Sequence, residues 1–512
     1  MVPARHAALS TDHLEALAAA VCALKTGVMS TYSHRPDDLA STRNRTSPPP
    51  GSGSPDDTPE EVISISGAGD ALALVQHTFG FLPEDSLVVV GLHGTRVGAH
   101  LRIDLRAGAD HPEGLAQWVC DHLAGPRVSP RPDGAVIYLF VGEAPAPPTW
   151  DDPSLRPYAA LHASLTAALR DQHEIHVEQS WWVGDGHIRD YDCLDSRCCA
   201  YPGQDVQAAA ASVLHAHMVY RGRILRTPRQ VVDDFLAPAA SPSDQTVDAV
   251  AAEQAHLGLD VADSQGAQQA LWVWDQMIQD EVREREGREP PERPGLPAGD
   301  ESERIEAWAD EHRDQLSMMV GSLSQGDVPD AVLVLAADGL DVAALGHEVI
   351  RACRDVPGAA GEDAGAEGRL TALARRWAEH AQPCREGAGA TAASIEDQRR
   401  LIEAHLKRFH ATLQGATGER PRWDRLDALA AILSQLQPML VAEQKTETLA
   451  LMSWIEWARG RGTLSGAYLD RCLHLVPGHQ VGRMRKTDRG IGRICPWAMV
   501  REHSWGISRT GT

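Results

Sequence analysis

Three cysteines in one short segment have the residue types and the spacing to hold a metal ion. Cys193, Cys198 and Cys199 form a C-x4-C-C pattern inside the turn-rich stretch 180–203, and His187 precedes them. Thiolates and imidazoles together suit zinc, and three cysteines with one histidine make a closed structural site. The pattern therefore predicts a candidate zinc site formed by these four residues.

Two other interpretations of the cysteines stay open. Structural zinc sites usually use paired C-x2–4-C elements, and adjacent cysteines seldom both point at one metal. The thiols also fit a redox-active or disulfide-forming pair, or a turn in which they only pack. His215 and His217, in the segment that follows, are alternative fourth ligands.

Arginine-rich segments are the second candidate chemistry. Segment 221–229 (RGRILRTPR) holds four arginines, and segment 482–493 (GRMRKTDRGIGR) holds four arginines and one lysine. Arginine binds phosphate or carboxylate through two parallel hydrogen bonds. The candidate anion-binding residues are Arg221, Arg223, Arg226, Arg483 and Arg485. The alternative is a solvated or internally ion-paired surface.

Motifs of the common enzyme classes are missing from the sequence. It contains no G-x-x-x-x-G-K-[ST], H-E-x-x-H or G-x-S-x-G motif. Gly67 and Gly69 precede a predicted helix as in a dinucleotide fingerprint, but Leu72 stands where the third glycine belongs, which favours a plain turn. The catalytic residues are therefore unknown, and no cofactor other than zinc is predicted.

Composition and charge limit the classes of partner. The 512 residues carry a formal charge of −23, which disfavours bulk binding to nucleic acid or to anionic membranes. No run approaches the roughly 18 apolar residues of a spanning helix. The nine cysteines follow no disulfide framework. We expect a cytoplasmic protein whose partner is another protein or a small anionic molecule.

Hydrophobic periodicity predicts an α/β domain over residues 62–203, after an N-terminal extension, 1–61, that is too polar to fold. Strands are predicted at 62–66, 86–92, 96–105, 135–141, 174–183 and 187–191, with helices at 69–79, 112–123 and 155–170. Strands that alternate with helices indicate a largely parallel or mixed sheet of about six strands, flanked by helices.

The remainder of the chain has a helical pattern. A helical segment, 204–288, is expected to pack on or link the α/β domain, and the proline-rich stretch 289–300 reads as a linker. A mainly helical C-terminal domain, 301–512, follows. Within it, 331–336 is the one stretch that could form a strand.

Four segments together resemble a known family. They are GFLPEDSLVVVGLHGTRVGAHLRIDL (80–105), DYDCLDSRCCAYPG (190–203), MVYRGRILRTPRQVVDDFLAPA (218–239) and SWIEWARGRGTLSGAYLDRCLHLVPGHQVGRM (453–484). They are similar to the actinobacterial proteins grouped as domain of unknown function 4192. Ala200 and Tyr201 depart from the prolines that tend to follow the cysteine pair, and Arg461 stands where a small acidic residue is common. The resemblance implies an intracellular actinobacterial protein but no activity, cofactor or catalytic residue.

Two classes of function fit these patterns. The first is a non-catalytic binding or interaction protein, since paired catalytic residues are missing. The second is an enzyme acting on a small anionic or phosphorylated substrate, in a cleft between the α/β and helical regions. Convergence of Arg102, Arg221 or Arg226 with Asp192 or His187 would favour the enzyme.

Overall fold

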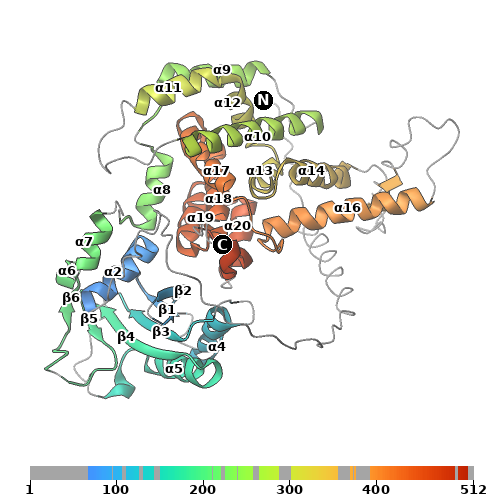
Figure 1. Ribbon diagram of the computed structural model, residues 1–512. Helices are drawn as coiled ribbons and strands as arrows, with labels where there is room; N and C mark the ends of the chain where they lie inside the picture. Colours follow the sequence, from blue (N-terminus) through green and yellow to red (C-terminus); the bar gives the residue numbers. More distant parts are fainter. Residues whose placement is uncertain are drawn as a thin grey trace, which may run out of the picture. The chain divides into compact units, whose positions relative to one another are not determined.

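The computed structural model of the chain describes most residues between 67 and 505 (Figure 1). The described ranges are 67–94, 96–106, 111–125, 128, 131–142, 150, 152–195, 197–209, 211–220, 225–238, 240–257, 264–287, 301–355, 370–372, 374–375, 392–490 and 494–505. The predicted N-terminal extension, the strand at 62–66 and the linker at 289–300 lie outside them. The chain divides into two compact units: Ile65–Glu348 with Leu406–Thr512, and Met1–Ser64 with Val349–His405.

A six-stranded mixed sheet is the centre of the N-terminal part, in the order β2-β1-β3-β4-β5-β6. The strands are β1 (Ser86–His93), β2 (Arg96–Asp104), β3 (Gly134–Phe140), β4 (His176–Gly184), β5 (His187–Asp190) and β6 (Gln204–Asp205). Strands β3 and β4 pair in parallel, and the other neighbours pair antiparallel. The predicted mixed α/β fold followed by a mainly helical region is confirmed.

Helices cover both faces of this sheet (Figure 1). Helices α4 (Pro112–Ala124) and α5 (Ala159–His173) pack on one face, against β1 residues such as Leu87 and Val89. Helix α2 (Ala68–Phe79) packs on the other face, against Val88 and Val90. Because successive side chains of a strand point to opposite faces, a strand covered on both sides reads as one continuous apolar run.

Glycines end two of the N-terminal elements, α2 and β1. Gly80 ends α2 with a φ of 85° and donates its N–H to the carbonyl of Gln76. Gly94 takes a φ of 59° between β1 and β2, and its N–H donates to the carboxylate of Asp133 at 2.8 Å. Both backbone conformations favour glycine, since a Cβ is strained at positive φ.

Helices make up the described chain after β6. They are α6 (Val206–Ala209), α7 (Val213–Tyr220), α8 (Pro228–Leu236), α9 (Asp244–Leu257), α10 (Ser264–Gly287), α11 (Glu301–Glu311), α12 (Arg313–Ser322), α13 (Val328–Ala337), α14 (Leu340–Asp355), α16 (Ala392–Leu413), α17 (Trp423–Leu436), α18 (Ala442–Ala458), α19 (Gly462–Leu475) and α20 (Gln480–Gly490). Short 3-10 turns lie at Pro496–Met499 and Arg501–His503. Among the described residues, no helix is both long and apolar enough to cross a membrane.

The structure corrects the suggested strand at 331–336, which is the interior of α13. Every residue from Ala331 to Ala337 is buried. A helix buried on all sides has no polar face, so its sequence shows the same uninterrupted apolar run as a buried strand. Pro329, in the first turn, is the local signal for a helix start.

Candidate metal centre

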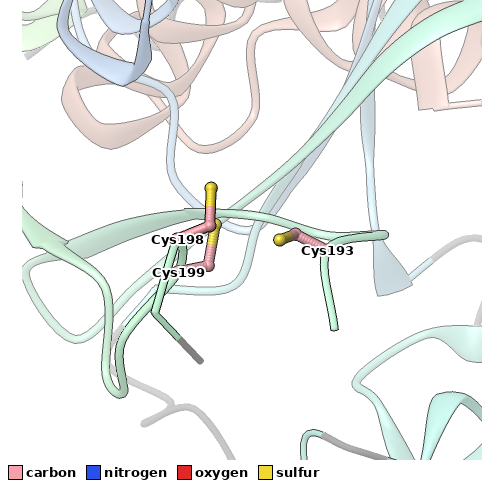
Figure 2. A group of neighbouring side chains, drawn as sticks. All are labelled: Cys193, Cys198 and Cys199. Atoms are coloured by element: carbon pink, nitrogen blue, oxygen red, sulfur yellow. The ribbon is translucent and has the colours of Figure 1, made fainter. Parts of the chain in front are cut away.

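The loop between β5 and β6 brings three cysteine side chains together (Figure 2). Cys193 follows the end of β5, and the adjacent pair Cys198 and Cys199 stands shortly before β6. The three Sγ atoms all lie within 4.8 Å of one another. The adjacent residues Cys198 and Cys199 therefore both contribute a thiol to one cluster. The sequence alone did not predict this, because adjacent cysteines seldom both point at one metal.

Hydrogen bonds inside the loop fold it into this shape. The Asp190 carboxylate oxygen Oδ1 accepts the backbone N–H groups of Asp192 at 2.9 Å and Cys193 at 3.0 Å. The carbonyl of Asp195 accepts the N–H groups of Cys198 at 3.0 Å and Cys199 at 2.8 Å. Aspartate favours such turns because its short side chain bonds to backbone just ahead of it. These bonds hold the loop backbone in a tight turn at both ends of the cluster.

Two buried arginines lie beside the loop, with Arg189 6% exposed and Arg156 5% exposed. Arg189 donates from Nη2 to the carbonyl of Cys199 at 3.2 Å and lies over the ring of Trp150, with its Cζ 4.2 Å from the ring centroid. Arg156 donates from Nη1 to the carbonyl of Tyr191 at 2.5 Å. Positive charge is therefore buried against the backbone of the cysteine loop.

Burial changes the pKa of one thiol of the cluster, that of Cys199. It raises the pKa of Cys199 to about 12, and the hydrogen bond with Cys193 adds to the shift. A reactive redox cysteine needs a lowered thiol pKa, because the thiolate is the nucleophile. Cys199 therefore lacks the lowered pKa of a redox nucleophile, and the six described cysteines are all free thiols.

The structure does not bring His187 into the cluster. His187 begins β5, opposite Gly184, whereas Cys193 follows the other end of that strand. Its Nδ1 lies 2.7 Å from the carbonyl oxygen of Asp185, in its own hairpin. His215 is also elsewhere, with its Nδ1 3.2 Å from Nε2 of His77. Within the described residues, the metal-ligating group consists of the three cysteines and no histidine.

Three of the five candidate anion-binding arginines lie among the described residues, in different surroundings. Arg226 pairs with Asp234 at 2.9 Å on the surface. Arg485 is buried and pairs with Asp330 at 2.6 Å. Arg483 is exposed. The other two candidates, Arg221 and Arg223, lie outside the described residues.

An enzyme was to be favoured if Arg102, Arg221 or Arg226 converged with Asp192 or His187. Of these arginines, Arg102 and Arg226 are among the described residues, and both have other partners. Arg102 donates from Nη1 to the hydroxyl of Thr463 at 2.5 Å, and Arg226 is paired with Asp234. Asp192 lies 3.8 Å from Nε2 of His162 instead. The guanidinium groups of Arg102 and Arg226 are thus engaged with partners outside the cysteine loop.

Comparison with known protein families identifies the family to which the chain belongs. A family model described as Domain of unknown function (DUF4192) matches residues 69–361. The chain belongs to the DUF4192 family. The DUF4192 match contains the whole sheet and the cysteine loop. No curated protein and no solved structure matches the chain.

Residues that surround the cysteines were not found by sequence reasoning. Trp150 and Arg156 come from the stretch before α5 and Arg189 comes from β5 of this DUF4192 chain, and no motif links the two segments. Trp150 precedes α5 and Arg189 lies on β5, so only the folded sheet brings them together. Their shared location beside the thiols is therefore new information from the structure.

Proposed function

We propose that this DUF4192 protein is a metal-binding interaction protein that holds one zinc ion at Cys193, Cys198 and Cys199. The observation that supports the proposal is the spacing of the three Sγ atoms, all within 4.8 Å of one another. Zn–S bonds of about 2.3 Å in a tetrahedron place the sulfurs about 3.8 Å apart. Small rotations of the three cysteine side chains would bring their Sγ atoms to this separation.

The chemistry of the surroundings fits a metal bound by thiolates. Three thiolates outweigh the charge of Zn²⁺ and leave the centre with one negative charge. A buried negative charge is costly unless positive groups lie near it. Arg189, bonded to the carbonyl of Cys199, and the buried Arg156 supply that positive charge. When bound, the zinc would lock the loop backbone through its three sulfurs.

The fourth ligand position connects the metal to the interaction role. Three protein ligands leave one position on a tetrahedral ion for water or another donor. Cys198 is exposed, so that donor can come from outside the chain. On the same loop, Leu194 and Tyr201 are 57% and 56% exposed. Exposed apolar side chains beside an open metal position support docking of a protein partner.

The remaining expectations also belong to the proposal. We infer a cytoplasmic location because free thiols persist in a reducing compartment, and an actinobacterial source from the family resemblance. The enzyme alternative has less support, because Arg102 and Arg226 are engaged away from the loop.

Titration with cobalt(II), a spectroscopic substitute for zinc, tests the metal proposal. Full-length wild-type protein is expected to develop thiolate-to-cobalt charge-transfer absorption that saturates at one equivalent. Cys198→Ser removes an exposed ligand and is expected to abolish the absorption, whereas Cys120→Ala, which replaces a buried cysteine of α4, is expected to keep it. Equal absorption in wild type and Cys198→Ser contradicts the proposal.

A further inference from the structure

A cavity of about 260 Å³ lies in the helical region, away from the cysteine loop. Helix α10 contributes Asp275 and Gln279, the start of α14 contributes Asp338–Val342, and the start of α17 contributes Arg422 and Arg425. The volume fits a small molecule rather than a peptide. Three segments distant in sequence meet here, since Asp338 and Gly339 form the junction between α13 and α14, and the cavity is polar.

Two of the acidic groups in the cavity wall are already engaged. Asp338 accepts from Arg408 at Oδ2 and Oδ1, at 2.5 and 2.9 Å, and from the hydroxyl of Thr412 at 2.9 Å. Asp275 accepts from Arg425 at 2.5 Å and from Gln279 at 2.6 Å. The donors of Asp338 lie outside the cavity wall, whereas Asp275 pairs with Arg425, so among the described residues Arg422 is the wall arginine whose charge no carboxylate neutralises.

The cationic groups of the wall keep unused donors. Arg425 is 6% exposed; its Nη2 bonds to Asp275, while its Nε is buried without a hydrogen-bond partner. Arg422 is exposed, and among the described residues its guanidinium has no hydrogen bond or ion pair. Arg422 lies against Gly339, where an added Cβ would be 3.5 Å from Nη1. A buried arginine with an unused N–H is costly unless a further acceptor approaches it.

The N-terminus of α14 adds a third attractive feature. Residues 340–342 form the first turn of this 16-residue helix and line the cavity. The first N–H groups of a helix have no carbonyl partner within it, and the helix dipole favours an anion there. Gly339 has a φ of 130° and donates to the carbonyl of Val334, so α13 turns directly into α14. Asp341 is exposed in this turn and is the one carboxylate of the wall with no partner named above.

We propose that this cavity binds the oxyanion group of a small molecule, a phosphate monoester or a carboxylate, between Arg422, Arg425 and the first turn of α14. Arginine forks and helix N–H groups are the donors that proteins use for such groups. The site differs from the predicted anion-binding arginines. It also lies outside the metal centre, so the proposal does not depend on zinc.

Isothermal titration calorimetry of the full-length, metal-free protein tests the site, with inorganic phosphate and acetate as separate probes. Saturable binding of one equivalent of either anion is expected, and the stronger probe identifies the oxyanion. Arg422→Ala is expected to weaken binding about tenfold or more, since it removes a charged donor. Because the Arg422 side chain is exposed, this variant is expected to fold as wild type does.

The control is Arg229→Ala, which removes an equal charge from a side chain that is 91% exposed on α8. It is expected to bind as wild type does. Cys198→Ser is also expected to bind the anion normally, which separates this site from the metal centre. Absence of saturable binding to both anions, or equal affinity in wild type and Arg422→Ala, would overturn the proposal, as would equal weakening by Arg229→Ala.

Discussion

Arg189 donates a hydrogen bond from Nη2 to the backbone carbonyl of Cys199 at 3.2 Å. The same guanidinium lies over Trp150, so a strand residue, an aromatic ring and the cysteine turn are joined. The contact places a positive charge against the backbone of Cys199 and restrains the segment that carries this thiol. Arg189 is therefore the residue through which the sheet positions the proposed metal centre.

Replacing Arg189 tests this relationship. Arg189→Ala is expected to lower the zinc affinity about 10- to 100-fold, the range seen when groups that orient metal ligands are removed. Competition with a chromophoric chelator measures the change. Arg189→Lys keeps the charge but loses the planar stacking on Trp150. Its zinc affinity is therefore expected to lie between those of wild type and Arg189→Ala.

Arg170→Ala is the matched control, because Arg170 is exposed on α5 and pairs only with its neighbour Asp171. Its zinc affinity is expected to equal that of wild type. If Arg189→Ala folds and binds zinc as tightly as this control, Arg189 has no role at the centre.

Metal affinity is expected to rise with pH. Burial raises the pKa of Cys199 to about 12, so the metal-free thiol is protonated at neutral pH and the metal must displace its proton. Each proton displaced makes the apparent affinity increase up to about tenfold per pH unit. Calorimetry in two buffers of different ionisation enthalpy counts the protons released. An affinity that is unchanged between about pH 6 and pH 8 contradicts this expectation.

Two helical glycines are expected to respond oppositely to alanine. A Cβ at Gly346, in α14, would lie 2.8 Å from Cγ of Phe409, which is 1% exposed. Gly346→Ala is expected to lower the free energy of unfolding by about 1–2 kcal/mol, because overpacking exceeds the gain in helix propensity. Gly466→Ala, in α19 with nothing within 4 Å, is expected to raise it by up to about 1 kcal/mol. Urea denaturation measures the free energy of unfolding of both variants. An equal change in this free energy for Gly346→Ala and Gly466→Ala would show that the Phe409 ring moves freely.

The interaction role predicts that the exposed apolar residues of the loop contact the partner. Leu194→Ser and Tyr201→Ser are expected to reduce recovery of one partner in affinity capture from the native host, without lowering the zinc content. Leu401→Ser, which replaces a leucine on α16 that is 47% exposed, is the control. Recovery that depends on none of these side chains assigns the interaction to another surface.

Much of the sheet could be predicted from hydrophobic pattern. The apolar run of β1 and the alternation in β2 placed both strands within about a residue of their observed ends. The segment 331–336 was harder, because a helix and a strand buried on all sides have the same apolar composition. Helices α9 and α14 lie in regions predicted to be helical, but neither helix was located individually. In α9, which follows a Ser-Pro-Ser loop, alternating small residues give little amphipathic signal.

The candidate site was only partly visible in the sequence. Cysteine is rare enough that the C-x4-C-C pattern identifies the loop, but spacing does not reveal whether adjacent side chains converge. His187 was included because it is near in sequence, although the extended β5 carries it away from Cys193. The residues of the oxyanion cavity, such as Asp275 and Arg422, come from distant segments and share no motif. Only packing brings them together.

Native mass spectrometry of the purified full-length protein is the most direct test of the metal centre. Wild-type protein is expected to carry one zinc ion per chain, and Cys193→Ser is expected to carry none while remaining folded. Cys120→Ala is expected to retain the ion. Folded wild-type protein that contains no metal and takes up none from added zinc contradicts the account.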